Sequence, residues 1–261
     1  MIQRNAIASW LCVHPAVRVV LAGDEAGIAE TAASLGVEHV PHLARNDRGT
    51  PLLDDALRLV DERAENGLAC FVNSDILLPP SLSVAAARVR AKADRFLLVG
   101  ECWNVAIDSA LDPTTLAWDE LRRRGRKRGV DALDYFVFTP GLYRDIPPFA
   151  IGRTAWDNWL VWKARSDGAA VVDATPVVRA IHQDHTYAHM GGLGKVRTGV
   201  EALENRRLTG GGRERLYSRL DATHRLTPRR LVPNPLAVAH SGETVRRAWA
   251  KLSGIVGFRR A

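Results

Sequence analysis

The chain has 261 residues, of which 46% are hydrophobic and 25% are charged, and its formal net charge is +7. This composition is ordinary for a globular protein, and the length fits one α/β domain with an appendage or two small domains. No apolar run approaches the ~20 residues that a membrane-spanning helix needs. Because His14 and Arg18 interrupt the apolar N-terminal region, we expect no signal peptide.

The three cysteines, Cys12, Cys70 and Cys102, are scattered and form no CxxC pair. Cys12 and Cys70 lie in apolar contexts, which is typical of reduced thiols in a core. We therefore expect a cytoplasmic protein without a structural zinc ion.

Basic residues are dense over 122–128 and again from Arg206 onwards. The first cluster has no interleaved aromatic residues and matches no nucleic-acid motif, so we expect no nucleic-acid partner. A solvated loop is one interpretation. The other is contact with an anionic acceptor or with the inner face of the membrane.

Residues 1 to about 182 alternate helix-like and strand-like segments with short connections. This alternation predicts an α/β fold with a mostly parallel sheet covered by helices on both faces. The expected helices are 3–13, 26–35, 51–65, 81–93 and 156–165. The expected strands are 17–22, 37–40, 68–72, 96–99, 135–138, 171–173 and 177–181.

The sequence changes character after residue 190. An amphipathic helix is expected over 196–208, a proline-punctuated extended segment over 227–235, and a last helix over 243–252. Because this region has too few apolar residues for its own core, we expect residues 191–261 to form a basic, mainly helical extension or lid. Residues 1–190 form the expected main domain.

The most informative segment is the apolar run 68–72 followed by Asn73, Ser74 and Asp75. A carboxylate at the carboxyl end of a buried strand lies where open α/β sheets bind ligands. Asp75 is a hard oxygen donor suited to a divalent cation that holds a diphosphate. These residues are also good turn formers, and both interpretations are open for the segment taken alone.

A polar turn over 45–51 leads into the expected helix 51–65. A helix N-terminus with a nearby Arg45 suits an anion or a nucleotide. An ordinary helix start, with Thr50 as the N-cap, is the alternative.

Asp157 lies between Trp156 and Trp159 at the start of another expected helix. Partial desolvation by the aromatic rings would raise the pKa of this carboxyl, which would make it a general base for a hydroxyl nucleophile. A first-turn acid favoured by the helix dipole is the alternative.

His182 and His185 follow the expected strand 177–181. Imidazole is a common metal ligand, but the spacing matches no standard zinc motif. A histidine that completes a site begun by Asp75 is more economical than a three-histidine zinc site. Polar loop histidines remain an alternative.

Taken in chain order, these segments resemble glycosyltransferases of the GT-A fold, the nucleotide-diphospho-sugar transferase fold, over residues 1 to about 190. They are similar to a bacterial branch with N-S/A-D-I and G-R-x-x-W-D-N-W-L signatures. The matching positions are Asn46 and Gly49 for the early turn, Asn73-Ser74-Asp75 for Asp-x-Asp, Gly141 for the acceptor loop, Trp156-Asp157-Asn158 for the aromatic and acid motif, and His182 for the late histidine.

The resemblance implies a role for each of these positions. It implies Mn²⁺ or Mg²⁺ bound by Asp75 with His182 or His185, and Asp157 as the catalytic base. It places the donor at Asp24, Arg45, Asn46, Gly49, Asn73, Ser74 and Asp75. It places the sugar or acceptor at Trp103, Asp108, Gly141, Trp156 and Asn158.

The implied activity is metal-dependent transfer of a hexosyl or related sugar from a nucleotide-diphospho-sugar donor to a hydroxyl acceptor, with inversion if Asp157 is the base. A nucleotidyltransferase of related fold is a competitor, although we find no glycine-rich basic loop near the N-terminus. A catalytically degenerate nucleotide-sugar or anion-binding protein is another. Asn73 replaces the family's first acid, and the chain is expected to begin at the helix after the fold's usual first strand.

Overall fold

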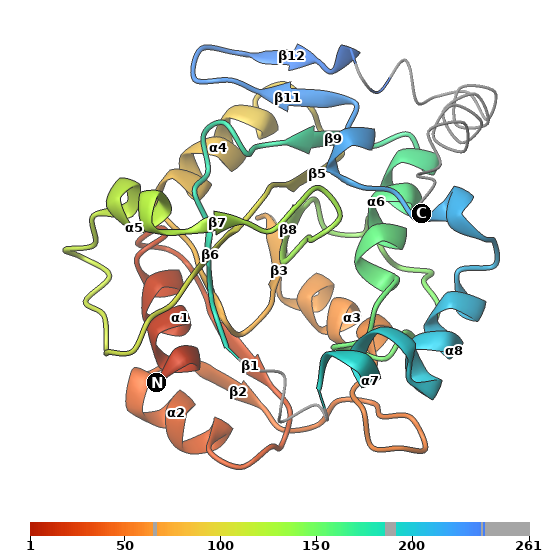
Figure 1. Ribbon diagram of the computed structural model, residues 1–261, viewed down its shortest axis with the longest axis horizontal. Helices are drawn as coiled ribbons and strands as arrows, with labels where there is room; N and C mark the ends of the chain where they lie inside the picture. Colours follow the sequence, from red (N-terminus) through yellow and green to blue (C-terminus); the bar gives the residue numbers. More distant parts are fainter. Residues whose placement is uncertain (65–66, 186–191, 236, 238–261) are drawn as a thin grey trace, which may run out of the picture.

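The computed structural model describes residues 1–64, 67–185, 192–235 and 237 (Figure 1). The helices are α1 (Ile2–Leu11), α2 (Ile28–Leu35), α3 (Leu53–Arg63), α4 (Ser81–Arg90), α5 (Trp118–Arg124), α6 (Trp156–Ser166), α7 (Leu193–Thr198) and α8 (Val200–Leu208), with 3-10 turns η2 (Arg213–Arg215) and η3 (Arg219–Asp221). The strands are β1 (Val20–Ala22), β2 (Glu38–Val40), β3 (Ala69–Val72), β4 (Ile76–Leu77), β5 (Phe96–Val99), β6 (Trp103–Val105), β7 (Arg126–Lys127), β8 (Tyr135–Phe138), β9 (Ala170–Asp173), β10 (Ile181–Gln183), β11 (His224–Leu226) and β12 (Leu231–Pro233).

The strands form a six-stranded sheet in the order β12-β11-β9-β5-β8-β3, a four-stranded sheet in the order β4-β10-β6-β7, and a two-stranded sheet β1-β2. The α/β class is confirmed, but the expectation of a mostly parallel sheet is wrong. β8 runs antiparallel to both of its neighbours, β3 and β5. The chain reaches β8 through β6, α5 and the antiparallel strand β7 instead of a single crossover helix, so it enters the sheet from the opposite end.

Apolar side chains on the two faces of the central sheet pack into two clusters. Along β5, Phe96 and Leu98 join the cluster that contains residues of α1 and α4, whereas Leu97 and Val99 join the cluster that contains residues of α3 and α6. This alternation follows from the two-residue period of a strand. The expected covering of the sheet by helices on both faces is therefore confirmed.

The described part of the C-terminal region continues the central sheet. β11 pairs in parallel with β9 and antiparallel with β12, so residues 224–233 add two strands to the sheet. The region therefore contains strands as well as the helices α7 and α8, which Gly199 separates. The expected helix 243–252 lies outside the described residues.

Several elements differ from the expected ranges in their ends. Gly36 ends α2 in the left-handed conformation (φ +64°), as expected of a glycine at that position. The expected strand 177–181 is wrong, since β10 covers Ile181–Gln183 and so includes His182. In the part of the chain that the structure describes, no helix is both long and apolar enough to cross a membrane.

Polar residues lie together at one end of the strands of the central sheet. β3, β5 and β9 run in the same direction, because β8 is antiparallel to β3 and β5 while β9 is parallel to β5. The carboxyl ends of β3, β5 and β9 therefore lie at the same end of the sheet as the amino end of β8. The segment 73–75 and Asp134, which directly precedes β8, both lie at this end of the sheet.

Candidate metal centre and its cleft

Strand pairing brings the predicted metal ligands together. Asp75 lies between β3 and β4, and β4 pairs antiparallel with β10 so that His182 stands opposite Ile76. The backbone N–H of Gln183 donates to the carbonyl oxygen of Asp75 at 3.1 Å. Residues separated by more than one hundred positions thus become neighbours through an ordinary β-ladder.

Asp75, His182 and His185 form a compact set of possible metal ligands. The Oδ2 atom of Asp75 lies 3.1 Å from Nε2 of His182 and 2.9 Å from Nε2 of His185. The two imidazole rings stack with centroids 5.5 Å apart. One ligand atom from each residue falls within 4.8 Å of the others. We define these three residues as the DHH cluster.

The electrostatics of the DHH cluster favour an ionised carboxylate. Burial would raise the pKa of Asp75, but hydrogen bonds and charge interactions with His182 and His185 outweigh it and lower the pKa to about 2. Oδ1 of Asp75 and Nδ1 of His182 are buried without a hydrogen-bond partner among the described residues. Because such unpaired atoms are rare and costly in a folded protein, they point to a site that takes a further ligand.

A second carboxylate, Asp134, supports this cluster from the start of β8. It accepts a hydrogen bond from Nδ2 of Asn73 at 3.1 Å, and Nε of Arg128 lies 3.2 Å from its other oxygen. Burial raises the pKa of Asp134, whereas Arg128 and His182 lower it in part. Asp134 and Arg128 are not among the site residues predicted from the sequence. The signal was an acid directly before the buried strand 135–138.

Asp157 lies in the first turn of α6 and is half-buried. Its Oδ1 has no hydrogen-bond partner in the described part of the chain. Burial raises its pKa to about 7, backbone N–H groups at the start of the helix oppose this, and the charge of Asp134 adds to it. Ala155, two residues before Asp157 and at the N-cap position of α6, has φ +92°, which is strained for a residue with a side chain.

Asp157 and the DHH cluster line one cleft of about 1910 Å³. Arg128 and Asp134 line the same cleft. The charge of Asp75 raises the pKa of Asp134, and the charge of Asp134 raises the pKa of Asp157. Asp75, Asp157 and His182 therefore line one cleft, although they are far apart in the sequence.

Four of the predicted donor-binding residues do not line this cleft. Arg45 forms ion pairs with Asp24 and Glu25. Asn46 accepts from the backbone N–H groups of residues 48 and 50, and its amide donates to Glu201 at 2.8 Å. Gly49 adopts φ +77° in this turn. The local contacts thus account for the polar turn, and α3 begins at Leu53 without a side-chain cap from Thr50.

Three of the predicted acceptor residues are also outside the cleft lining. Trp103 is buried in β6, with the cations of Arg122 and Lys127 over its ring. Asp108 is exposed on the connection after β6. Gly141 lies in the turn after β8, where its N–H donates to Asp61.

The remaining predicted residues, Asn73, Ser74, Trp156 and Asn158, line the cleft. Trp156 packs against Phe71 and Phe136, and this packing explains much of its burial. The amide of Asn158 donates to the carbonyl oxygen of Tyr217 at 2.7 Å and so ties α6 to the C-terminal region.

No protein-family model matches the chain, and no curated protein matches it.

Proposed function

We propose that the chain is a metal-dependent glycosyltransferase that moves a sugar from a nucleotide-diphospho-sugar to a hydroxyl acceptor. One observation carries the proposal. The possible metal ligands Asp75, His182 and His185 share a cleft with Asp157, a carboxyl whose pKa is about 7. A cation site for a diphosphate and a base for a hydroxyl are the two chemical requirements of this reaction.

The donor set discriminates between the two expected cations. Mg²⁺ prefers an octahedron of oxygen ligands, whereas imidazole nitrogens favour transition-metal ions. We therefore favour Mn²⁺ over Mg²⁺ at Asp75, His182 and His185. A bound Mn²⁺ would supply positive charge that stabilises the departing nucleoside diphosphate. Because two histidines and one carboxylate also suit Zn²⁺ and Fe²⁺, these ions belong in the test.

Asp157 would act on the acceptor. The acceptor oxygen forms a bond to the anomeric carbon, the bond from that carbon to the diphosphate oxygen breaks with its electron pair leaving on the diphosphate, and the hydroxyl proton passes to Asp157. A base with a pKa near 7 is well matched to such a transfer at neutral pH. Arg128 lines the same cleft and adds a cation that favours an anionic donor.

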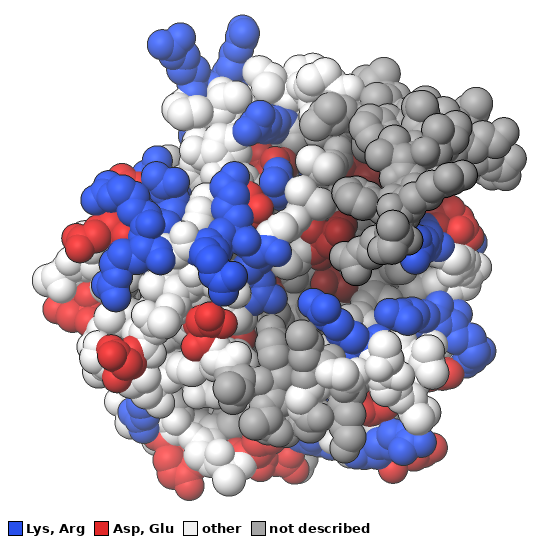
Figure 2. All heavy atoms as spheres, viewed as in Figure 1, with Lys and Arg blue, Asp and Glu red and all other residues white. Residues whose placement is uncertain are grey.

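A basic surface patch bears on the choice of acceptor. Figure 2 shows Lys and Arg side chains gathered over α5 and β7, the region of the basic residues 122–128. Such a patch favours an anionic acceptor, or one held at an anionic membrane surface, over a neutral one.

The test is a matched set of variants assayed with UDP- and GDP-sugars and with Mn²⁺, Mg²⁺, Zn²⁺ or Fe²⁺. Asp75→Ala should abolish metal-dependent donor binding, and Asp157→Asn should retain donor binding but lose donor turnover by roughly 10²–10⁴-fold. His42→Ala, at an exposed histidine outside the cleft lining, is the control and should leave both unchanged. Unchanged turnover in Asp75→Ala would reject the proposal.

A binding protein without turnover is the second candidate, because Asn73 stands where the resembled family has an acid and its amide is engaged by Asp134. Such a protein would bind nucleotide sugars in the presence of the metal. It would show no turnover at any pH, either as the wild type or as Asp157→Asn. The nucleotidyltransferase alternative would instead show release of pyrophosphate from a nucleoside triphosphate and a sugar phosphate.

A further inference from the structure

The cleft continues beyond the candidate metal centre, into the space between β1 and β3. Among the described residues, β1 pairs only with β2 and β3 pairs only with β8. Each strand therefore has one edge without a strand partner in the described structure. Residues of both strands line the same cleft. We call the part of the cleft between these two edges the inter-strand slot.

Apolar side chains from helices on both sides line the inter-strand slot. Residues of α1 and α3 line it together with residues of β1 and β3: Ile7, Trp10, Leu21, Leu59, Val60, Cys70 and Val72. The α1 side belongs to one apolar cluster of the core, and the α3 side belongs to the other. The slot thus lies in the layer of the sheets, with a helix on each face. Arg18, which also lines the cleft, has a side chain that is 71% exposed, so charge lies toward solvent.

Cys70 shows how unusual this space is. The sequence predicts a buried core thiol in the middle of an apolar strand, but the structure leaves Cys70 exposed. At the same time, burial raises the pKa of its thiol to about 12. Cys70 therefore contacts solvent while protein atoms surround it, as expected for a side chain that lines an internal cavity.

The size of the cleft supports the same view. Small-molecule pockets typically have volumes of about 300–1,000 Å³. The cleft measures about 1910 Å³, so a small ligand at the DHH cluster and Asp157 would leave much of it unfilled.

We propose that the inter-strand slot binds an extended peptide segment, apolar on both faces, that hydrogen-bonds through its backbone to β1 and β3 and joins their sheets. This inference concerns an interaction surface and does not depend on the proposed transferase activity.

Three properties of the slot favour a peptide strand over other occupants. Two facing strand edges offer backbone donors and acceptors, which an acyl chain cannot satisfy but a β-strand can. Strand addition to an exposed edge is an established mode of peptide recognition. Helices on both sides require apolar side chains on both faces of the occupant, as in the inner strands of α/β sheets. The apolar side chains that line the slot complement an apolar segment.

The first test adds a capped peptide of five alternating valine and isoleucine residues between two lysines to the full chain. This pattern is the same in either strand direction. We expect a rise in melting temperature of about 2 °C or more at saturation, and slower hydrogen exchange of backbone amides in β1 and β3. The control peptide has the same side chains with alternate backbone nitrogens methylated, which removes donors without removing apolar surface.

A second experiment covers the case in which the free peptide associates with itself. Met1 lines the cleft, so the same strand can be attached before Met1 through a glycine-serine linker, which raises its effective concentration. We expect a higher melting temperature than for an identical fusion with two prolines in the strand.

The outcomes separate clearly. Protection of β1 and β3 by the unmethylated strand alone supports the proposal. Equal stabilisation by the methylated peptide would show apolar binding without strand pairing and would overturn it. So would the absence of any effect from both the free peptide and the fusion, or protection confined to other elements.

Discussion

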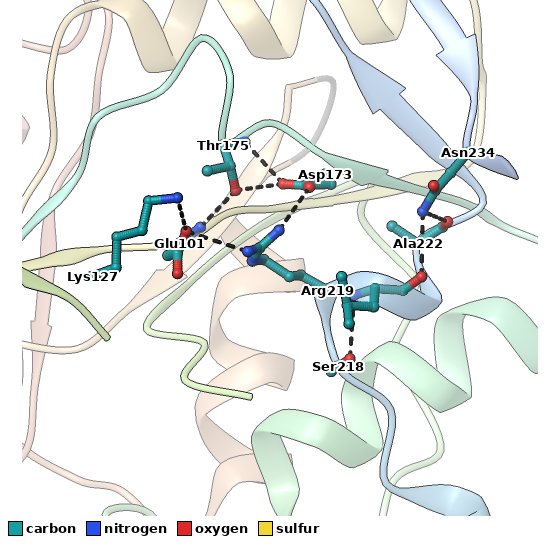
Figure 3. A network of polar contacts seen from close by, with 9 residues as sticks. Glu101, Lys127, Asp173, Thr175, Ser218, Arg219, Ala222 and Asn234 are labelled. Atoms are coloured by element: carbon teal, nitrogen blue, oxygen red, sulfur yellow. Dashed lines mark hydrogen bonds and ion pairs between the residues drawn. The ribbon is translucent and has the colours of Figure 1, made fainter. Parts of the chain in front are cut away.

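Two clusters of buried charge at the same end of the central sheet differ in the groups that balance the charge of their carboxylates. In the first, Glu101 and Asp173 are 2% and 5% exposed and share Arg219 (Figure 3). Nη2 of Arg219 lies 3.3 Å from Glu101, and Nη1 lies 3.3 Å from Asp173. Lys127 and Thr175 add contacts to Glu101 and Asp173. We call Glu101, Asp173 and Arg219 the arginine-bridged cluster.

The DHH cluster has no such cation among its three members. Asp75 faces two imidazoles, and polar atoms of Asp75 and His182 are left unpaired in the described structure. The comparison teaches that an acid at the carboxyl end of a strand is not by itself a site. Whether such an acid forms a binding site depends on its partners. An arginine bridge satisfies the carboxylates internally, whereas a set of metal-type ligands that faces a cleft does not.

The largest expected effect breaks the arginine-bridged cluster. Arg219→Met leaves two buried carboxylates without their shared cation, and we expect the free energy of unfolding to fall by about 3–5 kcal/mol. Urea denaturation measures this. Arg207→Met is the control, because Arg207 is an exposed partner of Glu204, and its loss should cost roughly 0–1 kcal/mol. Equal effects in the two variants would contradict a structural role for Arg219.

The second prediction concerns the pH dependence of stability through Asp157. Its pKa is raised from 3.8 to about 7 in the folded chain, so the folded state binds the proton more tightly than the unfolded state. The stability that this proton contributes is full below pH ~4 and is lost as pH rises through about 7.

We therefore expect wild type to lose up to ~4 kcal/mol relative to Asp157→Asn between pH 4 and 8, less where solvent screens the carboxyl. Denaturation of both proteins across this range measures the difference. A constant difference across this range would contradict the raised pKa.

A smaller effect sharpens the account of how Asp157 is placed. Ala155, two residues before Asp157, has φ +92°, a conformation that glycine adopts without strain. Ala155→Gly should therefore stabilise the chain by about 1 kcal/mol. Ala164→Gly, in the interior of the same helix, should instead destabilise it by about 1 kcal/mol or more. Destabilisation by both substitutions would contradict strain at Ala155.

The smallest effect concerns Asn73. Asn73→Ala removes the hydrogen bond to Asp134 but leaves the ligands of the DHH cluster in place. We expect a loss of about 1 kcal/mol in stability, measured by thermal unfolding, with metal affinity changed far less than in Asp75→Ala. A loss of metal affinity as large as in Asp75→Ala would place Asn73 among the ligands.

Local patterns in the sequence predicted part of this structure well. The apolar runs 96–99 and 135–138 match β5 and β8 residue for residue. Asp75 was found because an acid after a buried strand has a defined position in α/β sheets. The direction of β8 was not predictable, because strand direction depends on the path of the connection and not on the strand's own residues.

Non-local pairing explains the residues that were missed. Asp134 joins the site because β8 pairs with β3, and its own neighbours in the sequence give no sign of Asn73 or Asp75. Asn46 shows the converse, because its turn has the right composition for an anion site, but its polar groups bond to backbone N–H groups of the same turn and to Glu201.

The most direct test of the central claim is Mn²⁺ binding measured by electron paramagnetic resonance on the wild type, Asp75→Ala, His185→Ala and the control His42→Ala. We predict one tightly bound Mn²⁺ per chain in the wild type and in His42→Ala, and its loss in the two cluster variants. Equal Mn²⁺ binding in all four proteins, or none in the wild type with Zn²⁺ and Fe²⁺ also failing to bind, would contradict a metal centre at Asp75, His182 and His185.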